Sequence, residues 1–217
     1  PYWSSKPKQY RENLLALLEE IQAPIVDVVA IGIQNTGSTV YVLDGGSAYY
    51  NKEGQLLAAA PRFQEDLVFF SFEKEQENAE ISSQPMAEPS KISLLYDALV
   101  YAINRFANQC GISRVVIGLS GGIDSCIAAC LYRDALGADN VYGVNMPGPY
   151  NSQTTQDIAK TLASNLGIRY QVIPITASID LTKEQLEQSF PDLAITESVW
   201  ENMQARDRSS RILAAIA

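Results

Sequence analysis

The chain has 217 residues, of which 47% are hydrophobic, and this is enough material for one large globular domain or two smaller ones. The formal net charge is −9 and the basic residues form no cluster. Nucleic-acid and membrane surfaces need concentrated Lys and Arg, so the composition argues against both as partners. We find no signal peptide and no apolar run of about 20 residues, and we therefore expect a cytoplasmic protein.

The first 72 residues combine one helix with several strand-like runs. Leucines at helical spacing predict an amphipathic helix from Lys8 to Ile21, which ends before Pro24. Short apolar runs separated by Gly, Asn and Asp turns predict strands at Ile25–Ile33, Thr39–Leu43, Ser47–Tyr50 and Leu56–Ala60, and a fifth apolar run covers Leu67–Phe72. This part of the chain is expected to be strand-rich.

The composition changes after Phe72. Residues 73 to 91 contain mostly Glu, Lys, Pro and small polar residues, with almost nothing apolar. Such a stretch cannot bury a core and indicates an exposed acidic linker. We therefore predict three parts: a first domain at 1–72, a linker at 73–91 and a second domain at 92–217.

The second part alternates between helical and strand patterns. Predicted helices cover Ser90–Asn108, Asp124–Leu136, Ser152–Leu166, Ser178–Gln188 and Glu197–Ala217, and predicted strands cover Arg114–Leu119, Asn140–Met146 and Ile168–Ile173. Alternation of this kind predicts an α/β fold with a parallel, doubly wound sheet. Ligands of such sheets bind at the carboxyl ends of the strands.

The most informative stretch is RVVIGLSGGIDS, at residues 114 to 125. A buried strand is followed by a glycine turn and by Asp124 and Ser125, which are residue types that begin helices. A strand, a glycine turn and a helix N-terminus together point backbone N–H groups and the positive end of a helix dipole at one place. The sequence therefore predicts a phosphate-binding loop.

Three better-known loop patterns do not apply. No lysine follows Gly122 as a Walker A loop requires, and the glycine spacing does not match GxGxxG. Residues 118–122 do fit GxSxG, the nucleophile elbow of the α/β-hydrolases. The chain has no histidine, however, so it cannot supply a Ser-His-Asp triad.

The segment SGGIDS instead resembles the pyrophosphate loop of the ATP pyrophosphatases, which split ATP into AMP and pyrophosphate. The resemblance implies that ATP is bound by Gly118, Leu119, Ser120, Gly121, Gly122, Ile123, Asp124 and Ser125. It also implies that Asp124 holds Mg²⁺, a hard cation suited to carboxylate and phosphate oxygens.

Two later motifs narrow the resemblance. VNMPGPYNS, residues 144 to 152, is similar to the MPSxYSS stretch of NAD synthetases, with Gly148 where serine is more usual. ENMQARDR, residues 201 to 208, resembles the ENxQARxR signature of the same family, which faces deamido-NAD. On that resemblance Asn202 contacts deamido-NAD, and Arg206 is a candidate partner for its phosphate or carboxylate. Asp207 and Arg208 are expected on a solvated helix face.

The stretches PYWSSKPKQYRENL and VYVLDGGSAYYNKEGQLLAAAPRFQEDL look like the last third of a nitrilase-type glutaminase domain. The chain thus resembles an internal fragment of the glutamine-dependent NAD synthetases, from the end of a nitrilase-like α/β sandwich into a Rossmann-like ATP pyrophosphatase domain. Family properties then implied are glutamine binding at Lys6, homo-oligomers, and amidation of deamido-NAD through an adenylated intermediate. The glutaminase nucleophile lies upstream in that family, so the fragment alone is expected to be incomplete and inactive, with no catalytic residue assigned.

Two alternatives stay open at this point. Another ATP pyrophosphatase amidotransferase, such as a GMP or asparagine synthetase, would share SGGIDS without ENMQARDR. A non-catalytic adenine-nucleotide-binding module would use the same strand, loop and helix without a second substrate. Binding of deamido-NAD, rather than of xanthosine monophosphate or aspartate, would distinguish an NAD synthetase from these two alternatives.

Overall fold

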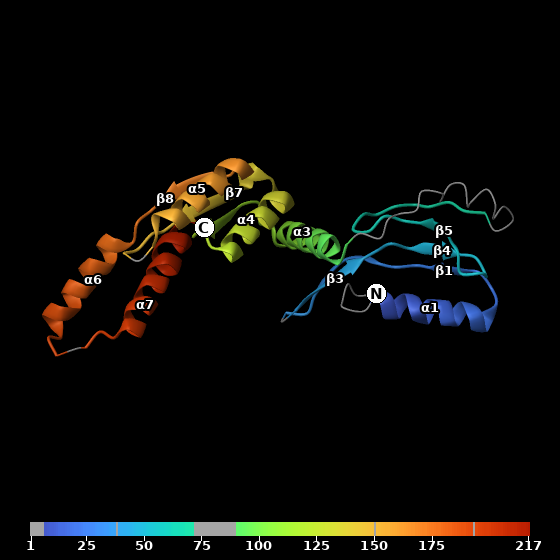
Figure 1. Cartoon of the computed structure of the whole chain (residues 1–217), viewed down its shortest axis with the longest axis horizontal. Coiled ribbons are helices and arrows are strands. Elements are labelled where there is room, and N and C mark those ends of the chain that lie inside the picture. The colour runs from blue at the N-terminus through green and yellow to red at the C-terminus, as the bar shows by residue number, and fades with distance from the viewer. Residues whose placement is uncertain (1–6, 38, 72–89, 150, 193) are drawn as a thin grey trace. The chain divides into compact units, whose positions relative to one another are not determined.

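The structure is a computed structural model that describes residues 7–37, 39–71, 90–149, 151–192 and 194–217 (Figure 1). The chain divides into two units, Pro1–Phe106 and Ala107–Ala217. Helix α3 (Lys91–Cys110) runs across this division along the sequence. The domain boundaries expected from composition stay a prediction, and the two units are described one at a time.

The N-terminal unit contains one helix before a set of short antiparallel strands. Helix α1 (Pro7–Ile21) matches the predicted helix. One sheet has the order β1 (Ile25–Asp27), β4 (Ala48–Tyr50) and β5 (Leu56–Ala59), and a separate hairpin pairs β2 (Ile31–Asn35) with β3 (Val40–Asp44). All of these pairs are antiparallel.

The single strand expected at Ile25–Ile33 is instead two strands in different sheets. Between them, both the N–H and the carbonyl of Val29 bond to the hydroxyl of Ser47, at 2.9 and 3.3 Å. A side chain from 18 residues away therefore replaces the ladder partner, and the strand is interrupted. The apolar run at 67–72 forms no strand over its described residues 67–71.

Buried side chains of the N-terminal unit come from both the helix and the strands. Leu14 and Leu18 of α1 are buried, as are Leu57 and Tyr49 of the sheet. The ring of Tyr49 stacks on Phe70, with centroids 4.4 Å apart. This aromatic pair anchors the irregular segment after β5 to the sheet.

The C-terminal unit is built on a parallel three-stranded sheet, as the alternating pattern predicted. Its strands are β6 (Val115–Gly118), β7 (Val141–Asn145) and β8 (Arg169–Val172), in that order, with Gly118 opposite Val144 and Asn145 opposite Val172. Helices α4 (Ile123–Leu136) and α5 (Gln153–Leu166) connect them, and a short turn, η1 (Ala138–Asn140), precedes β7.

Helical segments cover both faces of this sheet. On one face, Leu119 and Val141 pack with alanines of α4 and α5. On the other, Val144 and Met146 pack with Ile179 of α6 (Thr176–Ser189) and with Ile212 of η2 (Asp207–Leu213). The result is a mixed α/β unit whose central strand β7 is covered on both faces, as is usual in parallel sheets, while the edge strand β8 is largely exposed.

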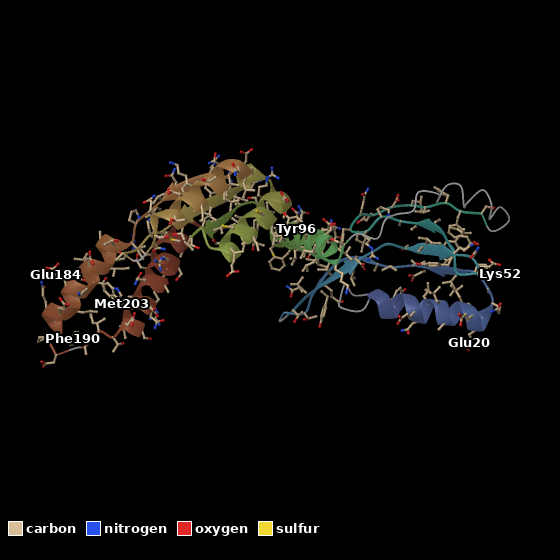
Figure 2. All side chains as sticks on the ribbon, viewed as in Figure 1. Glu20, Lys52, Tyr96, Glu184, Phe190 and Met203 are labelled. Atoms are coloured by element: carbon tan, nitrogen blue, oxygen red, sulfur yellow. The ribbon has the colours of Figure 1, made fainter. Side chains whose placement is uncertain are left out.

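The last helical stretch is not one regular helix. It consists of α7 (Glu197–Arg206), the π-helical segment η2 and a final turn, α8 (Ala214–Ile216). Helices α6 and α7 extend beyond the sheet (Figure 1), and Lys183 of α6 lies over the ring of Trp200 of α7 at 5.7 Å. Phe190 at the end of α6 is 60% exposed (Figure 2).

No helix in the described ranges combines the length and the apolar character that a membrane span would need.

Candidate nucleotide-binding site

The glycine loop, residues 118–125, begins at the carboxyl end of β6. Leu119 is completely buried, and its N–H donates to the carbonyl of Val144 at 2.9 Å, which extends the pairing with β7 by one residue. Ser120 is the first exposed residue beyond this bond. The loop therefore leaves the sheet at the edge where parallel α/β sheets bind ligands.

Gly121 turns the loop toward the first turn of α5. Its φ of +86° lies in the left-handed region that favours glycine. A Cβ at this position would collide with the backbone carbonyl of Thr155. Backbone conformation and packing thus each require glycine here, before any ligand is considered.

The hydroxyl groups of the loop bond to one another. Ser125 Oγ donates to the carbonyl of Gly122 at 2.9 Å, and the Gly122 N–H donates to Ser120 Oγ at 3.3 Å. The two hydroxyl oxygens are 3.1 Å apart, and because the Ser125 proton is already used, Ser120 is the donor of this bond. A phosphate contacting these hydroxyls would have to replace bonds within the loop.

Helix α4 begins with uncapped N–H groups. Its N-cap is Gly122, which offers no side chain, so the helix starts at Ile123, one residue earlier than predicted. The N–H groups of Ile123, Asp124 and Ser125 lie in the first turn and have no acceptor within the helix. They form, with the helix dipole, an open donor set for an anion.

Two other helices of this unit have capped N-termini, whereas α6, whose N-cap is Ile175, has no side-chain cap. Ser152 accepts a hydrogen bond from the N–H of Thr155 at the start of α5, at 3.3 Å. Thr196 accepts one from the N–H of Val199 at the start of α7, at 3.5 Å. The open N-terminus of α4 therefore differs from those of α5 and α7, and it is the one that follows the glycine loop at the carboxyl end of β6.

Asp124 is exposed in the first turn of α4 and is the acidic residue nearest the open donors along the chain. The described residues contain no group of three or more His, Cys, Asp or Glu side chains that could hold a metal by themselves. Mg²⁺ is usually bound by one or two carboxylates together with substrate phosphates and water. The donor set here fits Mg²⁺ only as an ion shared with a phosphate-bearing substrate.

Asn145, at the carboxyl end of the central strand β7, was not anticipated. Its side chain is 2% exposed, and its Nδ2 has no hydrogen-bond partner in the described part of the chain. By strand alternation it shares the α4 and α5 face of the sheet with Val141 and Gly143. A buried amide donor without an acceptor is unfavourable by about 1–3 kcal/mol, so the ligand edge contains an unused donor.

The predicted second-substrate residues lie on α7. The amide of Asn202 donates to the carbonyl of Ser198 on the same helix at 2.9 Å, and Arg206 is exposed. In the described residues no hydrogen bond connects either side chain to the glycine loop. Their roles stay predictions, and Lys6, the predicted glutamine contact, lies outside the described residues.

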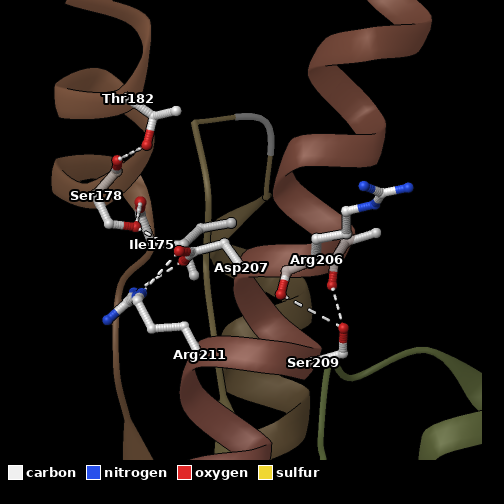
Figure 3. A network of polar contacts seen from close by, with 8 residues as sticks. Ile175, Ser178, Thr182, Arg206, Asp207, Ser209 and Arg211 are labelled. Carbon is white, nitrogen blue, oxygen red and sulfur yellow. Dashed lines mark hydrogen bonds and ion pairs between the residues drawn. The ribbon is translucent and has the colours of Figure 1, made fainter. Parts of the chain in front are cut away.

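The expectation that Asp207 and Arg208 belong to a solvated helix face is wrong. Asp207 accepts two hydrogen bonds from Arg211, at 2.7 and 2.8 Å, and one from Ser178 of α6 at 2.7 Å (Figure 3). The Arg211 bonds, helped by that of Ser178, hold the pKa of Asp207 below its usual value, although desolvation acts in the opposite direction. Arg208 is half-buried and points back to the sheet, where it donates to the carbonyl of Met146 at 3.1 Å.

These features place the C-terminal unit in the class of parallel α/β domains that carry a glycine loop between the first strand and an open helix N-terminus. Within that class, the family model for NAD synthase matches residues 95–217. The chain belongs to the NAD synthase family.

Individual relatives extend the likeness over both units. A glutamine-dependent NAD(+) synthetase of Synechocystis is 34% identical over 94% of this chain and 36% of that protein. The solved structure of a glutamine-dependent NAD+ synthetase from Acinetobacter baumannii, in complex with ADP, superposes with a TM-score of 0.85 at 27% identity, over 99% of this chain and 40% of that chain. A glutamine-dependent NAD(+) synthetase from Cytophaga hutchinsonii has the same fold, with a TM-score of 0.78 at 15% identity over 98% of this chain and 41% of its own.

The chain spans only part of these proteins, between 36% and 42% of the length of the curated relatives.

Proposed function

We propose that the glycine loop binds the phosphates of ATP. The observation that carries this proposal is the open N-terminus of α4, where a glycine N-cap leaves the first-turn N–H groups without acceptors at the carboxyl edge of a parallel sheet. The ADP complex of the Acinetobacter baumannii structure, a relative of the same fold, supports a nucleotide as the ligand. The unused amide donor of Asn145 at the same edge is consistent with a polar ligand there.

We further propose that the complete protein converts deamido-NAD to NAD. The nicotinate carboxylate would attack the α-phosphorus of ATP while the bond to pyrophosphate breaks. Ammonia would then attack the acyl carbon, lose a proton and displace AMP. The N–H groups of Ile123 and Asp124 would stabilise the charge that grows on the departing pyrophosphate.

Mg²⁺ would be held by Asp124 and would neutralise phosphate charge when bound. The role of the chain's own residues is to orient the triphosphate. The buried Leu119 fixes the start of the loop, and Gly121 fixes its direction against Thr155. Asn202 and Arg206 on α7 are proposed to contact deamido-NAD, through an amide that can donate and accept and a guanidinium suited to phosphate or carboxylate.

The N-terminal unit is proposed to be the C-terminal part of a nitrilase-like glutaminase domain that supplies the ammonia. Support comes from the Acinetobacter baumannii structure, whose superposition covers 99% of this chain, including that unit. The boundaries 1–72, 73–91 and 92–217, the glutamine contact at Lys6, a homo-oligomeric assembly and a cytoplasmic location belong to this proposal.

The test is deamido-NAD-dependent exchange between labelled pyrophosphate and ATP, measured with the complete protein. Adenylation of the carboxylate is reversible, so label should enter ATP only when both ATP and deamido-NAD are present. Xanthosine monophosphate and aspartate serve as control substrates and should support no exchange. Release of ADP and phosphate without exchange would overturn the proposal, and exchange with a control substrate would favour a different amidotransferase.

A further inference from the structure

The loop that follows β7 is held in shape by a turn of its own. The N–H of Gly148 donates to Asn151 Oδ1 at 2.8 Å, and the N–H of Asn151 donates to the carbonyl of Gly148 at 3.2 Å. At its start, Met146 is buried in the core beneath the sheet. Because β7 is the neighbour of β6, this loop borders the glycine loop at the ligand edge.

Arg208 reaches this loop from η2, far along the chain. Its Nε donates to the carbonyl of Met146 at 3.1 Å, and its Nη2 donates to Asn151 Oδ1 at 3.4 Å. The guanidinium thereby connects both ends of the loop, and Asn151 Oδ1 accepts from Gly148 and from Arg208 at once. A rigid planar group with several N–H donors is suited to such a two-point contact.

The surroundings of Arg208 are unusual for a cation. It is half-buried, and burial lowers its pKa, while the neighbouring Asp207 acts in the opposite direction. In the described part of the chain both of its hydrogen bonds go to neutral oxygens, because the carboxylate of Asp207 bonds to Arg211 and Ser178. A partly desolvated charge with neutral acceptors gains little stability, so its geometry has to be explained by something else.

The loop is also packed closely against the same helical stretch. A Cβ on Gly148 would lie 2.9 Å from Gln204 Oε1 and 3.2 Å from Arg208 Nη2. Gln204 is itself buried near the end of α7. Arg208 lies in a π-helical segment, and such segments occur frequently at functional sites. The loop after β7 is therefore closely packed against the end of α7 and the start of η2.

We propose that Arg208 is a positioning residue that fixes Met146 and Asn151 against α7 and η2. It would connect the carboxyl edge of the sheet, where ATP is proposed to bind, rigidly to helix α7, which carries Asn202. ATP and deamido-NAD would then be held in the relative position that the reaction needs. The inference rests on the proposed function. Misplacement of a reacting group by about 1 Å can lower a rate by about 100-fold, so a small shift of this loop should be measurable.

The test uses the complete protein with ammonia as nitrogen donor and compares Arg208→Ala, Arg208→Lys and Arg211→Ala. Arg211→Ala is the matched control, since it removes the same residue type from the same segment but disturbs only the Asp207 bonds. Arg208→Ala should lower kcat/KM for ATP by about 10-fold or more. Arg208→Lys should stay close to Arg208→Ala, because an ammonium lacks the planar fork. Arg211→Ala should lower the melting temperature and leave kcat/KM near wild type.

Several results would overturn the inference: wild-type kcat/KM in Arg208→Ala, equal losses in Arg208→Ala and Arg211→Ala, or full recovery in Arg208→Lys. If Arg208→Ala does not fold, Asn151→Ala removes the Oδ1 that accepts from both Gly148 and Arg208 and should lower the same parameter by a smaller factor. An unchanged value there also contradicts the idea. If the proposed function itself is wrong, the wild-type protein will show no deamido-NAD-dependent exchange between pyrophosphate and ATP. This result is distinct from a failure of the inference about Arg208, in which wild type shows the exchange.

Discussion

Helices α4 and α5 begin at equivalent places in the fold, but the backbone N–H groups of their first turns are treated differently. Each follows a strand of the parallel sheet through a short loop, at the same edge. In α5 the hydroxyl of Ser152 accepts a hydrogen bond from the N–H of Thr155. In α4 the N-cap is Gly122, which has no side chain to accept such a bond. Because a serine N-cap is more favourable than glycine by only a few tenths of a kcal/mol, the open terminus of α4 costs the protein little stability. The comparison supports the proposal that the N-terminus of α4 is left open for a ligand, whereas that of α5 is closed by Ser152.

The largest expected effect comes from removing the charge at the open terminus. Asp124→Asn in the complete protein should lower kcat by at least about 100-fold, because a catalytic metal contributes several kcal/mol at the transition state. Steady-state kinetics across a range of Mg²⁺ concentrations measure this, with circular dichroism as a control for folding. Near wild-type turnover would remove Asp124 from the site.

A second substitution tests whether the contact to the other substrate is separate from the open terminus. Asn202→Ala should raise the KM for deamido-NAD by the equivalent of about 1–3 kcal/mol, because a buried partner in the substrate is left without its hydrogen bond. The KM for ATP should change little. The increase should be the same with ammonia or glutamine as nitrogen donor, and an effect confined to glutamine contradicts the assignment.

A third substitution makes α4 resemble α5. The φ and ψ of Gly122, −76° and 154°, are available to any residue, so Gly122→Ser can supply the missing cap. Its hydroxyl should occupy the first-turn N–H groups and raise the KM for ATP about tenfold, while the melting temperature stays equal or rises slightly. Calorimetric titration with a non-hydrolysable ATP analogue gives the affinity directly. Unchanged affinity would mean that these N–H groups do not bind phosphate.

The smallest effect is expected from the reverse change at α5. Ser152→Ala removes the cap and should lower the free energy of unfolding by about 1 kcal/mol, since the Thr155 N–H loses its acceptor. Urea denaturation measures the loss. The KM for ATP should remain at the wild-type value, and a rise comparable to that of Gly122→Ser would erase the difference between the two termini.

The features that could be predicted from sequence are those that depend on neighbours along the chain. The strand, glycine turn and helix at residues 114–136 were located to within a residue, because apolar pattern and glycine placement are local signals. The pairing of Gly121 with Thr155 was not visible, since it depends on how α5 packs against the loop. The NAD synthase family could likewise be predicted from short continuous motifs, which are recognisable in the sequence alone.

The expectations that failed depended on distant contacts. The strand at 25–33 is broken by a hydroxyl 18 residues away, and the last helix changes to a π-helical turn where Asp207 bonds to Ser178, 29 residues away. The sequence around Arg208 predicts a solvated residue, because nothing near it along the chain shows that its partner is Met146, 62 residues earlier. Helical periodicity gives the face of a residue only while the helix stays regular.

The contact between Gly121 and Thr155 also determines how mutational scans of this loop should be interpreted. Any side chain at 121 meets both an unfavourable φ and a carbonyl oxygen, so a library selected only for folding would already return glycine there. Invariance at 121 would then carry no information about nucleotides. Ser120 is exposed and is under no such steric constraint from the backbone. A selection for nucleotide binding would therefore first become visible at position 120, as a preference that a selection for folding lacks.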